Sequence, residues 1–169
     1  DDLVETDGLF YKKFTEVPFS GKVTTGSEQG SFKKGKRDGP WVRYHDNGRI
    51  KGKGDFKNGK HEGTWVFYHD NRQLNAKVNF KDGKPDGPYV GYYYSGKLKI
   101  QETYKNGELN GPQIFYYKNG QLQTEGYYKD GKRNDRWITY NNDGNKSSYG
   151  NYKNGKKNGY WAFYRKNGK

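Results

Sequence analysis

The chain has 169 residues and a formal net charge of +13, and only 29% of its residues are hydrophobic. Since 17 Tyr, 9 Phe and 4 Trp make up most of that fraction, the apolar surface available for burial is largely aromatic, which argues against a thick two-layer core. Disordered chains with low hydrophobicity and high charge are poor in aromatic residues, whereas the 18% found here is typical of strands. A folded chain is therefore predicted. No apolar run approaches the roughly 18 to 20 residues that a membrane-spanning helix needs, so the chain is not expected to be transmembrane.

The chain contains neither cysteine nor methionine. The lack of cysteine excludes a disulfide framework, a cysteine-based metal site and a thiol nucleophile. Because translation begins with methionine, a chain that starts at Asp1 and has none is expected to have lost its original N-terminus. We therefore expect an exported protein, periplasmic or extracellular, after removal of a signal peptide.

Residues 1–29 form the first predicted segment. They do not fit the repeat that follows, but residues 8–11 and 17–23 look like strand and turn pieces of a degenerate unit. Terminal repeats are often atypical because they cap a stack. The sequence thus predicts an N-terminal capping segment before the repeats.

Six tandem repeats occupy residues 30–169. They start at residues 30, 54, 78, 102, 126 and 150, which is one unit every 24 residues, and the last unit is incomplete. Three positions are constant in type: an aromatic residue, the lysine that follows it, and a glycine two residues later. The aromatic residues are Phe32, Phe56, Phe80, Tyr104, Tyr128 and Tyr152. A period this regular is typical of a repeat architecture.

Each unit is predicted to supply two antiparallel strands. One strand is a segment of the type Trp-Val-x-Tyr, which ends in the invariant tyrosines 44, 68, 92, 116, 140 and 164. The other covers residues 50–56 and their equivalents. Asn58-Gly59 and Asn47-Gly48 have the composition of tight hairpin turns, because positive φ costs Gly nothing and Asn little. The predicted fold is all-β: tandem hairpins in an elongated, twisted, single-layer antiparallel sheet.

Side-chain alternation predicts two unlike faces. On residues 50–56 the even-numbered positions share a face, and on the next strand Val66 and Tyr68 lie together, opposite Trp65. We expect the Phe, Val, Tyr and Leu columns to form the buried face, and the other face to be mixed aromatic and basic. Prolines at positions 40, 88 and 112 favour a bulge that would shift this assignment.

From Gly30 to Lys169 the units follow the form G-x-[FY]-K-[ND]-G-K-x-[DN]-G-x-W-x-x-[YF]-x-x-N-G-x-L, which resembles the MORN-repeat-variant family. The resemblance implies hairpins stacked side by side and a role in holding proteins or membranes together rather than in catalysis. Bacterial members are often labelled antitoxin-like, and residues 7–23 look like the lead-in of exported bacterial members. Arg72, Gln113 and Asp135 depart from the pattern at a turn glycine, the tryptophan and the second glycine.

Candidate chemistry outside the repeat pattern is sparse. His45 and His69 occupy equivalent positions in adjacent units, roughly 10 Å apart across two strand spacings, which is too far for one metal ion. Residues 141–145 resemble a calcium loop but fall on the turn position of every unit and lack the closing Glu. No nucleophile, phosphate loop or carboxylate pair stands apart from the repeats. Neither an enzyme nor a cofactor is therefore expected.

Two columns are candidate binding residues. The invariant lysines form a predicted anion-binding ladder with steps of roughly 9.5 Å, although lysines beside a turn can also be simple solubilising residues. They are Lys33, Lys57, Lys81, Lys105, Lys129 and Lys153, with a second row at Lys36, Lys60, Lys84, Lys132 and Lys156. An aromatic column at Trp41, Trp65, Tyr89, Trp137 and Trp161 could stack on bases or sugars if exposed, or pack if buried.

These observations favour a non-catalytic scaffold that binds a protein partner or a second copy of itself through an aromatic and basic surface. An adaptor for anionic phospholipid or polysaccharide, held by the lysine ladder, is the alternative. Single-stranded nucleic-acid binding through lysines and tryptophans is a weaker third hypothesis. Salt separates these hypotheses, because electrostatic binding weakens at high ionic strength whereas an apolar interface persists.

Overall fold

The computed structural model describes residues 3–165, and every helix or strand assigned in that range is a β-strand. A small hairpin, β1 (Leu3–Thr6) and β2 (Leu9–Lys12), precedes a 14-stranded antiparallel sheet. The strands of that sheet are β3 (Gly21–Val23), β4 (Glu28–Lys33), β5 (Lys36–Tyr44), β6 (Ile50–Lys57), β7 (Lys60–Tyr68), β8 (Leu74–Lys81), β9 (Lys84–Tyr92), β10 (Leu98–Lys105), β11 (Glu108–Leu109), β12 (Gly111–Tyr116), β13 (Leu122–Lys129), β14 (Lys132–Tyr140), β15 (Lys146–Lys153) and β16 (Lys156–Phe163).

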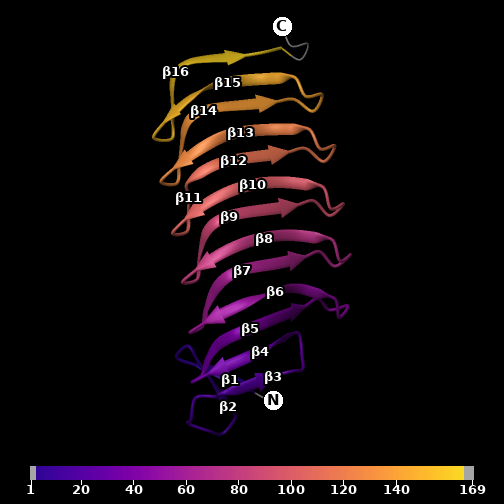
Figure 1. The fold of residues 1–169 in the computed structure, drawn as a ribbon, viewed down its shortest axis with the longest axis vertical. Helices are drawn as coiled ribbons and strands as arrows, with labels where there is room; N and C mark the ends of the chain where they lie inside the picture. The colour runs from indigo at the N-terminus through magenta and orange to yellow at the C-terminus, as the bar shows by residue number, and fades with distance from the viewer. Residues whose placement is uncertain (1–2, 166–169) are drawn as a thin grey trace.

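The strand order in the sheet follows the chain from β3 to β16, with the two-residue β11 pairing only with β10. Figure 1 shows the result as an elongated stack of hairpins whose turns lie along two opposite edges. Each repeat adds two strands, and within residues 3–165 no strand of the repeats folds back over this sheet. The all-β prediction of tandem hairpins in one antiparallel sheet is confirmed.

Tight turns at one edge join β6 to β7 and their equivalents. Lys57 pairs with Lys60, and the two residues between them have positive φ, 51° at Asn58 and 80° at Gly59. This is the conformation that matches the twist of a two-residue hairpin, and it favours Asn, Asp and Gly. At the other edge Arg72 takes the position of the turn glycine with φ of 74°, so that departure leaves the turn conformation unchanged.

A bulge in each unit overturns part of the predicted face assignment. Lys53 pairs with Val66 and Asp55 with Glu62, so three residues of β7 lie opposite Gly54 alone. The extra residues, which begin at Gly63 with φ of 64°, shift the alternation. Since paired residues point to the same side of an antiparallel sheet, Trp65 shares a face with Phe56, and Val66 and Tyr68 lie on the opposite face.

A second bulge places Ile50 opposite Tyr44, so Ile50 joins the Val and Tyr columns instead of the Phe column. The prediction that Phe, Val, Tyr and Leu columns form one buried face is therefore wrong. We call the side that carries Phe56 and Trp65 the tryptophan face. We call the side that carries the ladder lysines, the invariant tyrosines and the Val66 column the lysine face.

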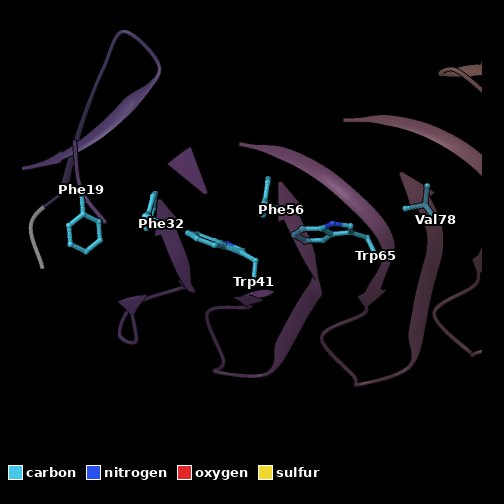
Figure 2. Close-up of a cluster of buried hydrophobic side chains, with 6 residues drawn as sticks. All are labelled: Phe19, Phe32, Trp41, Phe56, Trp65 and Val78. Atoms are coloured by element: carbon cyan, nitrogen blue, oxygen red, sulfur yellow. The ribbon is translucent and has the colours of Figure 1, made fainter. Parts of the chain in front are cut away.

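The core is a row of side chains along the tryptophan face. Figure 2 shows Phe19, Phe32, Trp41, Phe56, Trp65 and Val78 following one another from strand to strand. Their rings meet edge to face: the Phe32–Trp41, Trp41–Phe56 and Phe56–Trp65 centroids are 5.1, 5.6 and 5.1 Å apart, with interplanar angles of 77° to 83°. Such pairs contribute about 0.5–1.5 kcal/mol each beyond the burial of their surface.

Each tryptophan lies against a glycine of the neighbouring strand. A Cβ added to Gly54 would sit 2.4 Å from the Trp65 ring, and glycines 30, 126 and 150 lie as close to tryptophans 41, 137 and 161. In the third unit tyrosine replaces the tryptophan and valine replaces the glycine: Tyr89, with its smaller ring, pairs with the larger Val78. In the fourth unit Gln113 donates a hydrogen bond to Glu102 instead. The two positions therefore vary together from unit to unit.

The N-terminal residues pack on the first unit. The Phe10 and Phe32 ring centroids are 4.9 Å apart, and the Phe10 N–H donates to the Gly35 carbonyl at 2.8 Å. Phe19 is buried in the same row of rings. The assignment of residues 1–29 as a separate capping segment stays a prediction, and these contacts are what such a cap would make.

Substitution of Gly54 by Val should destabilise the protein by about 1–3 kcal/mol, because the new side chain overlaps the Trp65 ring. Trp65→Tyr alone should also destabilise it, by leaving unfilled space. The double variant Gly54→Val/Trp65→Tyr reproduces the natural Val78–Tyr89 pair and should recover at least about 1 kcal/mol relative to the sum of the single changes. Urea denaturation of the four proteins measures this coupling, and additive losses would contradict the pairing.

Candidate binding surfaces

The lysine ladder lies along one edge of the lysine face. Its members are the last residues of β4, β6, β8, β10, β13 and β15, and all of them are exposed. Second-row lysines start the following strands, so that Lys57 stands opposite Lys60. Within residues 3–165 no ladder lysine forms an ion pair, because the ion pairs found there are those of Glu28 with Arg37 and Arg43. The ammonium groups are therefore open to solvent.

Acidic side chains interrupt this ladder in the first three units. Asp38 accepts the N–H of Asn58 at 3.0 Å, and Glu62 accepts the N–H of Asp82 at 3.1 Å. Asp86 makes the same bond to Asn106. Each carboxylate thus fastens the turn of the next unit and also brings negative charge among the lysines. In the last three units Asn110, Asn134 and Asn158 occupy this position, so this carboxylate is absent there, although Glu108 replaces the second-row lysine in the fourth unit.

Second-row lysines also help to hold units together. The Lys60 stem lies against Gly83, where an added Cβ would be 3.4 Å away, and the Gly83 N–H donates to the His61 carbonyl at 2.9 Å. The stem of a lysine can pack while its charged end remains in water. The second row is therefore partly structural, whereas the first row ends in free ammonium groups.

The aromatic column is core and not an open stacking surface. Trp41, Trp65 and Trp137 are 2%, 0% and 3% exposed. Trp65 and Trp137 donate their indole N–H groups to the carbonyls of Asp55 and Tyr127, at 2.9 and 3.2 Å. Tyr89 and Trp161 are partly buried on the same face. The nucleic-acid hypothesis loses its stacking residues through this burial.

Cationic side chains lie over the rings of three tryptophans on the tryptophan face. The Arg37 guanidinium lies 5.0 Å from the Trp41 ring centroid, and Arg133 lies 4.4 Å from that of Trp137. Lys157 repeats this arrangement over Trp161 at 4.4 Å. In the second unit the equivalent residue is His61, whose ring is 4.5 Å from Trp65. These cations contribute to packing through cation–π attraction rather than forming a separate basic surface.

The invariant tyrosines lie on the lysine face and not, as predicted, on the same face as the phenylalanine column. Tyr116 and Tyr140 donate to the carboxamide of Gln101 and the carboxylate of Glu125, at 3.2 and 2.8 Å. Burial, with the Glu125 bond and charge, raises the pKa of Tyr140 to about 12, so this phenol is neutral at physiological pH. These tyrosines are half-buried, so part of each side chain remains exposed.

The edge opposite the ladder is held by another set of contacts between successive units. The His45 Nε2 lies 3.0 Å from the Tyr68 carbonyl oxygen, and His69 repeats this contact with Tyr92 at 3.3 Å. Tyr93 and Tyr117 use their hydroxyls in the same way. The two histidines thus serve as unit-to-unit contacts. In the described residues no cluster of three or more His, Asp or Glu side chains forms a metal site.

Residues 141–145 form a turn. The Asn141 carboxamide oxygen accepts the N–H groups of Asp143 and Asn145, at 3.0 and 2.9 Å. This use of the side chain is the ordinary stabilisation of an Asx turn.

Residues 3–165 form no helix with the length and hydrophobicity that a membrane crossing requires.

Acidification should test the packing around His61. Burial, followed by the charges of Arg43 and Arg37, lowers the pKa of His61 below its ordinary value of 6.5, so the folded state favours the neutral ring. Stability contributed by this site is present above pH 6.5 and is lost as the pH falls, since the unfolded chain takes up the proton first. His61→Leu, which copies Leu109 of the fourth unit, should therefore lose less stability than the wild type between about pH 7 and pH 5.

The measurement is the urea midpoint at several pH values, with His69→Asn as the matched control because unit five has Asn141 at that position. The control should keep the pH dependence of the wild type. An unchanged pH dependence in His61→Leu would contradict the role given to His61.

The comparison with known families supports the repeat assignment. A family model described as MORN repeat variant matches residues 37–58, 85–106 and 109–130, each starting at the same position of the 24-residue unit. A search of curated proteins finds no match. MORN repeats are generally non-catalytic motifs, often with binding or scaffold roles. Through these repeats the chain belongs to the MORN-repeat-variant family.

Proposed function

We propose that this protein is a non-catalytic scaffold that binds a protein partner through its lysine face. The observation that carries the proposal is the difference between the two faces. The rings on the tryptophan face pack against one another, and Trp65 is completely buried. The lysine face repeats half-buried tyrosines and exposed lysines in every unit, and these side chains are not needed for that core.

The chemistry of the lysine face suits protein recognition. Tyrosine offers a rigid apolar ring with a polar end, and it is enriched in protein interfaces. Between the first and second units a hollow of about 450 Å³ is lined by Ile50, Tyr68, Gly48, Arg49 and Arg72. A second, of about 440 Å³, is lined in part by Pro112, Ile114, Tyr127 and Ile138. Apolar anchors of a partner can enter such hollows.

An adaptor for anionic phospholipid or polysaccharide is a second candidate, which the solvent-open ladder lysines favour. Such binding would draw on the lysines along the whole edge and would weaken as salt screens them. The carboxylates of Asp38, Glu62 and Asp86 reduce the positive charge in the first three units. For this reason we place the protein scaffold first.

Affinity capture from the source cells, at low and at about 0.5 M salt, separates the two candidates because the screening length is only a few ångströms at the higher salt. We expect a stoichiometric protein that remains bound at high salt. Ile50→Asp should weaken the affinity for this protein about tenfold or more, because Ile50 lines the first hollow. Since Ile50 is 39% exposed, its replacement should leave the fold intact.

Asn58→Asp is the matched control: it adds the same charge at the lysine edge, in a turn position where Asp82 and Asp130 occur naturally. The control should capture the partner as the wild type does. Capture of lipid or glycan that is lost at high salt, without any protein that stays bound, would contradict the scaffold function and favour the adaptor function. Equal capture by Ile50→Asp and the wild type would show that the first hollow is not part of the interface.

A further inference from the structure

A groove of about 680 Å³ lies on the lysine face between the fifth and sixth units. Its walls include three cations, Lys129, Arg136 and Lys153, and four asparagines at positions 134, 151, 154 and 158. Asp135 is its acidic residue. We propose that this groove binds an acidic polysaccharide, whose hydroxyls are held by the amides and whose anionic groups are held by the three cations.

The fifth unit departs from the repeat where this groove is formed. Residues 134–136 read Asn-Asp-Arg, whereas residues 38–40 and 86–88 both read Asp-Gly-Pro. Asp135 keeps the positive φ of the glycine it replaces, at 57°, a conformation that Asp tolerates less well than Gly. The sheet itself gains nothing from these three changes, since glycine and proline serve the same bulge in other units. Departures that carry a local cost are typical of functional sites.

The asparagine side chains of the groove are free to bind a ligand. In the first unit Asp38 fastens the next turn through the Asn58 N–H, but within the described residues the equivalent Asn134 makes no such bond to Asn154. The other three amides likewise have no hydrogen-bond partner in residues 3–165. Asn71 and Asn119, by contrast, donate to carbonyls of the following unit. In the part of the chain that the structure describes, the groove therefore contains four amides whose donors and acceptors remain unused.

The charge of the groove is positive and uncompensated by ion pairs. Within residues 3–165 neither Lys129, Lys153 nor Arg136 has a carboxylate within ion-pair distance. The Arg136 guanidinium lies 5.5 Å from the Tyr149 ring centroid, which fixes it toward the lysine face. Replacement of the acidic residue of earlier units by Asn134 leaves the two ladder lysines with only Asp135 as an opposing charge in the groove. An anionic ligand is thus favoured.

The mixture of groups distinguishes a sugar from other anions. An amide has two donors and an acceptor, so it can bond hydroxyl groups, which both donate and accept. The Asp135 carboxylate can accept a hydrogen bond from a hydroxyl, which an anionic sugar supplies and polyglutamate does not. Lysine and arginine supply charge-assisted bonds to a uronate carboxylate or a sulfate ester. A chain of anionic sugars uses all three kinds of group.

Titration calorimetry at about 0.15 M salt tests the site, with oligouronate and sulfated dextran oligosaccharide as anionic sugars that separate carboxylate from sulfate recognition. Neutral dextran and polyglutamate are the comparison ligands. We expect at least one anionic sugar to bind about tenfold or more tightly than polyglutamate of equal charge, and neutral dextran not to bind measurably.

Asn134→Asp and Arg136→Thr each restore a residue found in other units, Asp38 and Thr64, so both variants should fold. Each should weaken anionic-sugar binding about tenfold or more. Lys153→Gln should also weaken it, whereas Lys57→Gln, the same change at the same ladder position in the second unit, should not.

Polyglutamate binding as tightly as the sugars, or an equal loss in Lys57→Gln and Lys153→Gln, would overturn the proposal in favour of unspecific attraction to the ladder. Failure of both anionic sugars to bind would also overturn it. Neither result bears on the protein scaffold, which is tested through Ile50 and the hollow beside it.

Discussion

In four of the six units the sheet depends on the fit of an indole ring against a glycine in the next strand. A single-layer sheet has no second layer to cover its apolar side, so the side chains of one face must cover one another. Tryptophans achieve this by lying over glycines 30, 54, 126 and 150, close enough to exclude a Cβ. Phenylalanine or tyrosine rings from the adjoining strands meet the edges of these indoles in the first two and the last two units. In the third and fourth units the Val78–Tyr89 pair and the Glu102–Gln113 hydrogen bond take this place.

This packing also decides which surface is available for binding. Since the rings of the tryptophan face contact one another and are covered by Arg37, Arg133 and Lys157, little of that face is free for a partner. The lysine face carries no such closed row. Two of its invariant tyrosines, Tyr116 and Tyr140, donate single hydrogen bonds to Gln101 and Glu125, and its ladder lysines extend into solvent. Repetition then presents the same groups at every unit, and local replacements such as residues 134–136 create differences along the sheet.

The sequence predicted the hairpins and turns well because they depend on neighbouring residues. Asn58-Gly59 has the composition that a two-residue hairpin requires, and the period gives the order of the strands. The faces were assigned wrongly because strict alternation was carried through residues 63–65, where a bulge sets three residues against one. The correct pairing was nevertheless visible in the sequence: glycine accompanies tryptophan eleven residues later, whereas Val78 accompanies Tyr89 and Glu102 accompanies Gln113.

The candidate site could be predicted only in part. The ladder lysines lie in a row on one edge as expected, since their position in the unit is constant. Two further features could be recognised only from the three-dimensional contacts. One is the position of the Asp38, Glu62 and Asp86 carboxylates among the lysines, and the other is the groove formed where asparagine replaces them. Export of the protein and the capping role of residues 1–29 stay predictions, because they do not follow from the packing of the repeats.

The central claim is that each unit is stabilised by its immediate neighbours. Deletion of residues 54–77 tests it most directly, because this removes one unit and places Trp41 opposite Val78, as Trp65 is now. The Asp38 carboxylate would then face the Asp82 turn, which Glu62 now fastens. We predict a folded protein with cooperative urea unfolding and a lower m-value, in proportion to the surface removed. Loss of the folded state, with a flat denaturation curve, would show that the sheet depends on contacts beyond neighbouring units.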